Sequence, residues 1–349
     1  MLDILGDGQL AACAGAFGGV LLGLAARMGG FCTLGAIEDH LYGGTSLRLR
    51  MWGLAISLSM LGVAGLTAFD LFAPETALYL ATGWNPLAVI VGGLMFGVGM
   101  AFTGHCCHGA LARLGGGDLR AFVVVLVIGI SAYMTMAGPL AYARNWLFPV
   151  DTDLSKSIAD WLSLPFAPVA AAAGTLGVVW MLSAPAFLRQ RAMIGWSVVI
   201  TCAIVSGWAA TYWISTHGFD ADPVRSHSYA APIGETLLYT MTMSGSHIDF
   251  GIGSVLGVIA GASLGSLIKR EFRWEACEDP RELRRQLFGA FLMGSGAVTA
   301  LGCIIGQGLS AFSVLAPSAP LLLLAIYLGA KFGLHAIIAG ITLNGIRSA

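Results

Sequence analysis

The sequence has little charge. Of its 349 residues, 11% are Asp, Glu, Lys or Arg and 57% are hydrophobic, whereas an average soluble domain has about 25% charged residues. Too few polar side chains remain to cover a water-facing surface, which excludes a soluble protein. The chain also lacks a basic block and has a net charge of −1, so nucleic-acid binding has no electrostatic basis. The 48 glycines lie within apolar runs, as in closely packed membrane helices. We predict an integral membrane protein.

Apolar runs of about 20 residues, the length of helix that crosses a bilayer, predict nine spans. They lie near residues 9–26, 51–69, 86–112, 119–140, 165–187, 193–215, 248–268, 286–313 and 319–340. The opening residues, MLDILGDG, lack the basic region of a signal peptide, so we expect the first run to remain as a membrane helix. The expected fold is an all-α polytopic membrane protein with one transport domain over residues 1–349.

Basic residues gather in alternate loops. Loops 27–50, 113–120, 188–192 and 269–285 contain Lys or Arg, whereas loops 70–85, 141–164 and 216–230 are acidic or poor in both. Because basic loops stay on the cytoplasmic side of a membrane, this alternation predicts an N-terminus outside and a C-terminus inside.

Two spans are too long for one straight helix. Residues 86–112 and 286–313 would each extend for about 40 Å, against a hydrocarbon core of about 30 Å, and glycines interrupt both. We therefore expect broken helices there. Segments 31–43 and 228–245 are too short or too rich in glycine to span, which favours re-entrant half-helices.

The two broken spans repeat one pattern. Gly92, Gly97, Gly99, Cys106 and Gly109 recur as Gly289, Gly294, Gly296, Cys303 and Gly306, with a constant separation of 197 residues. The same shift superposes 51–69 on 248–266, 119–140 on 316–337, and 31–43 on 228–240. Since 86–112 starts outside and 286–313 inside, we predict an inverted repeat. Repeat 1 covers about 9–140, a linking helix about 165–187, and repeat 2 about 193–340. Such architectures bind substrate where discontinuous helices meet.

A cysteine begins the second half of each broken helix. A helix N-terminus has unpaired N–H groups and favours an anion, and Gly104, Gly109, Gly302 and Gly306 allow a close approach of the backbone. The soft thiols of Cys106 and Cys303 favour an anion with a polarisable atom, such as a sulfur or selenium oxyanion with a terminal chalcogen. Cys32 begins the half-helix 31–43, and its counterpart in the second repeat is Tyr229.

Several other polar residues each allow more than one interpretation of their role. Arg113 is either a cytoplasmic topology anchor or part of an anion exit path, and Glu235 is a weak candidate for proton coupling, whereas Asp249 is expected to be solvated. The run Gly104-His105-Cys106-Cys107-His108 suggests a metal, but four consecutive ligands cannot wrap a tetrahedral ion well. We therefore expect no metal site and no cofactor. Cys13 and Cys202 are expected to be inert apolar residues.

The motifs resemble a known family. GLMFGVGMAFTGHCCHGALARLGGGDL, FLMGSGAVTALGCIIGQGLSAFSVLAPSAP and RMGGFCTLGA resemble, in order, the two signatures and the N-terminal cysteine segment of the YeeE/YedE sulfur-transport family. The first signature is commonly G-x-G-M-x-x-x-G-G-C-x-x-G-x-L-x-R-x-G-x-G. This chain departs from it at His105, where glycine is usual, and at the polar pair Cys107-His108, whose role stays open.

The resemblance implies a bacterial inner-membrane protein that imports thiosulfate without acting as an enzyme, with a periplasmic N-terminus and a cytoplasmic C-terminus. It places functional cysteines at Cys32, Cys106 and Cys303. Neutral thiols would donate S–H hydrogen bonds in turn to the anion's terminal sulfur, without covalent change, in a region that includes His105. The family's frequent companion, a small TusA-like sulfur carrier in the cytosol, is a possible partner.

Three alternatives remain beside thiosulfate import. The chain could transport another sulfur or selenium species. It could be a membrane thiol oxidoreductase or sulfur-transfer protein using Cys106 and Cys303, although no C-x-x-C supports this. A purely structural subunit is the third, but broken helices are costly in a bilayer. A metal transporter using the His-Cys-Cys-His run would be a further alternative, but the consecutive ligands that disfavour a metal site disfavour it too.

Overall fold

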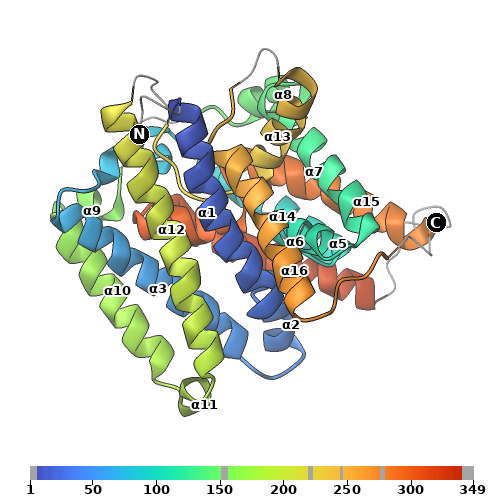
Figure 1. Cartoon of the computed structure of the whole chain (residues 1–349), viewed down its shortest axis with the longest axis horizontal. Helices are drawn as coiled ribbons and strands as arrows, with labels where there is room; N and C mark the ends of the chain where they lie inside the picture. Colours follow the sequence, from blue (N-terminus) through green and yellow to red (C-terminus); the bar gives the residue numbers. More distant parts are fainter. Residues whose placement is uncertain (1–5, 151–155, 219–222, 244–246, 276–279, 340–349) are drawn as a thin grey trace.

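The computed structural model describes residues 6–150, 156–218, 223–243, 247–275 and 280–339, and most of these residues are helical (Figure 1). The helices are α1 (Asp7–Met28), α2 (Thr33–Leu41), α3 (Leu47–Ala68), α4 (Leu78–Ala81), α5 (Pro86–Thr103), α6 (Cys107–Gly115), α7 (Leu119–Met136), α8 (Pro139–Leu147), α9 (Ile158–Trp161), α10 (Phe166–Leu182), α11 (Pro185–Leu188), α12 (Arg191–His217), α13 (Ala230–Thr242), α14 (Phe250–Ile268), α15 (Pro280–Thr299) and α16 (Ser318–Ile338), with a 3₁₀ turn η1 (Pro74–Thr76) and a π-helical turn η3 (Gly306–Ala311).

Seven helical segments among the described residues are long and apolar enough to cross a membrane. They are Asp7–Leu41, Leu47–Ala68, Pro86–Gly115, Leu119–Met136, Arg191–His217, Phe250–Ile268 and Ser318–Ile338. The helices α10 and α15 occupy the other two predicted spans, but α10 has 17 residues and α15 begins with the charged turn PRELRR. The all-α membrane architecture is therefore confirmed, whereas nine crossings stay a prediction.

Two predicted spans end earlier than their hydropathy indicated, because a proline begins the next helix. The predicted span 119–140 ends earlier, at Met136, because Gly138-Pro139 starts the separate helix α8. The predicted span 165–187 ends at Leu182, and Pro185 is the first residue of α11. A proline lacks the N–H that would continue the preceding helix and restricts the residue before it.

Both predicted helix breaks are present. The helix α5 ends at Gly104, whose left-handed φ of 81° favours glycine, and α6 begins after Cys106. The helix α15 ends at Thr299, and Leu301 and Gly302 have φ values of 59° and 159° before helix resumes at Ile304. The chain thus places a short half-helix after each long one.

Small residues allow the long helices to approach closely. On α1 and α14 (dark blue and orange in Figure 1), Gly253 lies against Ala12 and Gly257 against Ala16, so these helices pack in parallel. The helices α5 and α15 pack with the opposite sense, because Gly92 faces Gly296 while Gly99 faces Gly289. Without a hydrophobic driving force in lipid, such close packing is a main source of helix association.

Candidate functional site: converging half-helix N-termini

Four half-helices begin at a thiol or a phenol. Cys32, Cys106 and Tyr229 are the N-caps of α2, α6 and α13, and Cys303 directly precedes the half-helix that contains η3. The carbonyl of each accepts the first helical N–H, over N···O distances of 2.8–3.1 Å. The prediction that new half-helices start at the three cysteines is therefore confirmed. Each position combines unpaired backbone N–H groups with a side chain that can donate a hydrogen bond.

The sulfur atoms of Cys106 and Cys303 accept backbone hydrogen bonds. Gly109 N donates to Cys106 Sγ at 3.4 Å, within the same helix. Tyr229 N donates to Cys303 Sγ at 3.3 Å, from a segment 74 residues away, and Ser228 Oγ lies 3.7 Å from the same sulfur. Because each sulfur accepts an N–H, its own S–H stays available to donate to a ligand.

The structure brings the three predicted cysteines together. The Cys106 thiol lies within electrostatic range of both Cys32 and Cys303, and the Tyr229 hydroxyl lies within the same range of Cys106 and Cys303. Cys106 and Cys303 are 3% and 0% exposed, whereas Cys32 is partly exposed. The central thiols are thus closed off from solvent, whereas Cys32 is partly accessible.

Cys107 joins this cluster as a fourth thiol. It is fully buried and lies within electrostatic range of Cys106 and Cys303. All six cysteines in the described part of the chain are free thiols. In that part, no three His, Cys, Asp or Glu side chains are arranged to hold a metal ion.

The second break is bridged by a buried glutamine. Gln307 Nε2 donates to the carbonyl oxygens of Ala300 and Leu301 at 3.3 and 3.5 Å, and Ser318 Oγ donates to Gln307 Oε1 at 3.1 Å. In the first break, Thr103 Oγ1 bonds the carbonyl of His105 at 2.7 Å. These side chains satisfy backbone groups that the broken helix leaves without partners.

The predicted glycines surround the caps. Gly104 ends α5, and Gly302 lies within the second break. A β-carbon on Gly306 would lie 2.6 Å from Ser228 Oγ and 2.7 Å from Tyr79 Oη, and one on Gly109 would lie 3.1 Å from His105 Cβ. Gly306 therefore leaves room for two hydroxyl groups beside Cys303.

His105 directly precedes Cys106, whereas Arg113 lies at the other end of α6. The buried His105 ring is within electrostatic range of Arg113 and Asp118. Arg113 is in the last turn of α6, at the end opposite Cys106, where its guanidinium is 3.9 Å from Asp118 and 49% exposed. The structure does not bring Arg113 to the caps, so its two roles both stay predictions.

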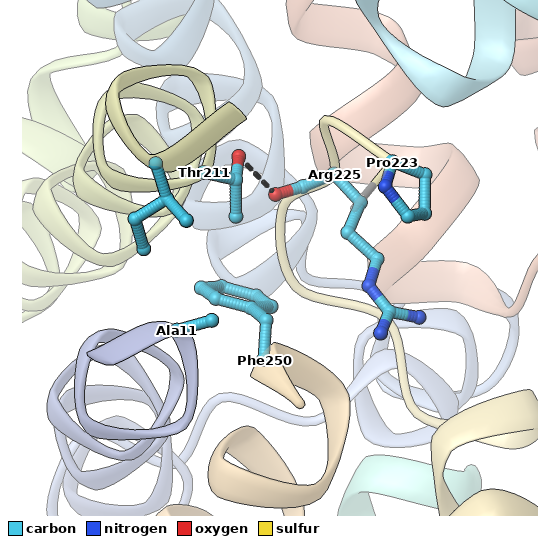
Figure 2. A pocket seen from close by; sticks show the side chains of 6 residues that line it. Ala11, Thr211, Pro223, Arg225 and Phe250 are labelled. Atoms are coloured by element: carbon cyan, nitrogen blue, oxygen red, sulfur yellow. Dashed lines mark hydrogen bonds between the residues drawn. The ribbon is translucent and has the colours of Figure 1, made fainter. Parts of the chain in front are cut away.

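A cluster of ion pairs holds the segment before Tyr229 in place. Figure 2 shows Arg225 beside a small pocket lined by Ala11, Thr211, Ile214, Pro223, Arg225 and Phe250, which contains none of the thiols. Thr211 Oγ1 donates to the Arg225 carbonyl at 2.8 Å. The Arg225 guanidinium pairs with Glu235, at 3.5 Å, and with Asp249. Asp249 also caps α14, so it is fixed in place rather than freely solvated.

Sequence reasoning missed the side chains around Cys303. Tyr79 and Ser228 come from distant segments, whereas Gln307 follows Cys303 by four residues within the quoted motif but was not singled out. Tyr229 did carry a signal, because the shift of 197 residues pairs it with Cys32. The structure confirms that both residues are N-caps.

Comparison with known proteins gives the family. The chain is 26% identical to the thiosulfate transporter TsuA of Spirochaeta thermophila over 316 residues, which cover 86% of this chain and 91% of that protein. It is also 26% identical to the thiosulfate transporter TsuA of Escherichia coli K12 over 306 residues, or 83% of this chain and 84% of that one. The sequence profile described as sulphur transport matches residues 28–332. This multi-pass membrane protein therefore belongs to the sulphur-transport (YeeE/YedE) family, whose members are transporters rather than enzymes.

Proposed function

We propose that this protein imports thiosulfate across the inner membrane of a bacterium, passing the intact anion along Cys106, Cys303 and Cys32. The family assignment and the names of two relatives that align over more than four fifths of the chain support this substrate. The proposed orientation keeps the N-terminus in the periplasm and the C-terminus in the cytoplasm, as the basic loops predict.

The observation that carries the proposal is the placement of each thiol at the N-terminus of its own half-helix. Unpaired N–H groups at a helix start bind anionic oxygens, so they suit the sulfonate end of thiosulfate. An S–H group whose sulfur already accepts an N–H donates to the terminal sulfur. A neutral thiol donates such a bond without repelling the dianion, and weak contacts at several sites allow the ion to leave again.

The packing of α5 and α15 supports an inverted repeat. These two helices correspond under the shift of 197 residues, and they pack antiparallel through Gly92 with Gly296 and Gly99 with Gly289. The same shift carries α2 (Thr33–Leu41) onto α13 (Ala230–Thr242) and Cys106 onto Cys303. Repeat 1 then covers about 9–140 and repeat 2 about 193–340, with the helix at about 165–187 linking them.

The buried thiols indicate a closed conformation. Cys106 and Cys303 are shielded from solvent, so the anion reaches them only when one repeat moves relative to the other, as alternating access requires. Cys32 is the most accessible of the three, which suits the last contact before release. A TusA-like sulfur carrier in the cytosol is the proposed partner at that side.

Uptake of thiosulfate labelled at its outer sulfur tests the proposal. Cells without their own thiosulfate import would express the wild-type protein, Cys106→Ala, Cys303→Ala, or the control Cys13→Ala, whose thiol lies exposed on α1. We expect uptake of intact thiosulfate by the wild type and the control, and its collapse in the two other variants. Label that enters only as persulfide or sulfite would instead indicate sulfur-transfer chemistry, and no uptake by the wild type would indicate another sulfur or selenium species.

A further inference from the structure

A buried hydrogen-bonded chain leads away from the central thiols. His227 Nδ1 lies 2.7 Å from Ser254 Oγ, and Ser254 Oγ donates to Tyr229 Oη at 3.2 Å. Tyr229 is the residue whose backbone N–H donates to Cys303 Sγ. His227, Ser254 and Tyr229 are all 0% exposed, so the chain is shielded from solvent along its length.

A second histidine faces the same chain. The His108 ring lies 5.1 Å from the Tyr229 ring, between centroids, and His108 is two residues beyond Cys106. His108 Nε2 and His227 Nε2 are buried atoms without a hydrogen-bond partner among the described residues. At each histidine, therefore, no hydrogen bond to Nε2 fixes which ring nitrogen holds the proton of the neutral form.

Among the described residues, no charged side chain contacts His227. His108 of α6 is within electrostatic range, and Tyr229 lies at the other end of the hydrogen-bonded chain. The helices α1, α12 and α14 place Gly18, the Ala203 carbonyl, Phe250 and Ser254 beside it, and Ser310 Oγ donates to its backbone carbonyl at 2.8 Å. Arg225, two residues before His227, pairs with Asp249, the N-cap of α14, and with Glu235 of α13. Protonated histidines here would repel one another unless an anion lay between them.

A dianion that enters a cell moves against the inside-negative potential. At a potential of roughly 100 mV, this opposition corresponds to an equilibrium concentration ratio on the order of a thousandfold against a dianion. Two protons carried with the anion cancel its charge and so remove this opposition. Three buried histidines lie near the thiols, His105, His108 and His227, and two of them, His108 and His227, contact Tyr229 or its hydrogen-bonded chain. A dianion at Cys106 and Cys303 would favour the imidazolium form of both.

We propose that this protein is a proton-coupled transporter, in which His108 and His227 each take up one proton with every dianion bound at the thiols. With both hydroxyl groups rotated so that Tyr229 donates to Ser254 and Ser254 donates to Nδ1 of His227, a proton added at Tyr229 shifts along the chain to Nδ1, while Nε2 keeps the proton it already holds. Both protons come from the periplasmic water and leave into the cytoplasm with the anion. Only bonds to hydrogen form or break in this process. The proposal rests on the proposed import of thiosulfate.

The purified protein in liposomes tests this coupling. Uptake of ³⁵S-thiosulfate would be measured together with the internal pH, reported by a trapped dye, in vesicles made with and without an inward proton gradient. We expect the lumen to acidify on addition of thiosulfate, with about two protons per anion. We also expect an inward proton gradient to raise accumulation at least about tenfold, and an imposed membrane potential to have little effect.

Variants separate the coupling from binding. We expect His227→Gln, His108→Gln and Ser254→Ala to lose the proton signal and the gradient-driven accumulation, while thiosulfate still slows thiol labelling at Cys32. Ser263→Ala, on the same helix as Ser254 and bonded only to its own turn, and His217→Gln, at the exposed end of α12, should behave as the wild type. Because Ser254→Ala removes a single oxygen, it tests the chain if a histidine variant fails to fold.

The outcomes distinguish the two proposals. Thiosulfate uptake without proton movement, or full coupling in both Ser254→Ala and His227→Gln, would overturn the proton coupling and leave thiosulfate import intact. An absence of thiosulfate uptake by the wild-type protein would overturn the import itself.

Discussion

Gly92 and Gly296 face each other so closely that neither position has room for a side chain. A β-carbon on Gly92 would lie 2.6 Å from the Gly296 carbonyl oxygen, and one on Gly296 would lie 2.6 Å from the Gly92 carbonyl oxygen. The pair Gly99 and Gly289 repeats this arrangement, at 2.5 and 2.7 Å. The reciprocity is what a two-fold relation between α5 and α15 would produce.

We predict that Gly296→Ala destabilises the protein by about 1–3 kcal/mol, because the added methyl group forces α5 and α15 apart. Thermal unfolding in detergent would measure the change. Gly65→Ala is the matched control, since a β-carbon there meets nothing within 4 Å. Equal unfolding temperatures for the two variants would contradict the packing of α5 on α15.

Gln307→Met should lower both stability and transport. The change leaves the buried carbonyls of Ala300 and Leu301 without the amide that bonds them, at a cost of about 1–3 kcal/mol. It also loosens the break that positions Cys303. Gln190→Met, on the exposed surface before α12, is the control. Normal uptake and stability in Gln307→Met would show that the break does not depend on this bridge.

Arg225→Met should destabilise the segment that holds Tyr229 over Cys303. It leaves Glu235 and Asp249 without their shared cation, and both carboxylates are about a quarter exposed, so we expect a loss of about 2–3 kcal/mol. The double variant Arg225→Met/Asp249→Asn should recover part of it, because asparagine still caps α14 without the charge. If the double variant is no more stable than Arg225→Met, repulsion between the carboxylates is not the cause.

Thiol labelling should follow the burial of the cysteines. In detergent, we expect a maleimide to modify Cys32 at least about tenfold faster than Cys106 or Cys303, because the latter react only when the protein opens. Peptide mass spectrometry over a time course would give each rate. Thiosulfate should slow labelling of Cys32, whereas labelling of the exposed Cys13 should not change. Similar rates at Cys32 and Cys303 would contradict the closed conformation.

The sequence predicted the features that depend on local patterns of residues. The breaks after α5 and α15, the N-caps at Cys32, Cys106 and Cys303, and the short helices α2 and α13 follow from glycine, cysteine and hydropathy patterns. It was insufficient where contacts join distant segments. The bond from Tyr229 N to Cys303 Sγ and the chain from His227 through Ser254 depend on how α13 and α14 pack, and periodicity within one helix carries no information about this.

Charge was also ambiguous in the sequence. Arg113 follows Cys106 by seven residues, yet the intervening helix α6 carries its guanidinium away from the thiols, toward Asp118. The sequence did not single out Arg225, because one arginine in a loop forms no local pattern that predicts an ion pair. Its pairing with Glu235 and Asp249 arises only when α13 and α14 meet.

The charged start of α15 has a consequence for biogenesis. Arg281, Glu282, Arg284 and Arg285 lie in the first two turns of this helix, and such residues disfavour lateral release of a nascent segment from the translocon into lipid. The helix α5 is synthesised almost two hundred residues earlier and offers Gly92 and Gly99 as a docking groove. We therefore expect insertion of α15 to depend on α5 already lying in the bilayer, which would make the second half of the chain depend on the first during synthesis.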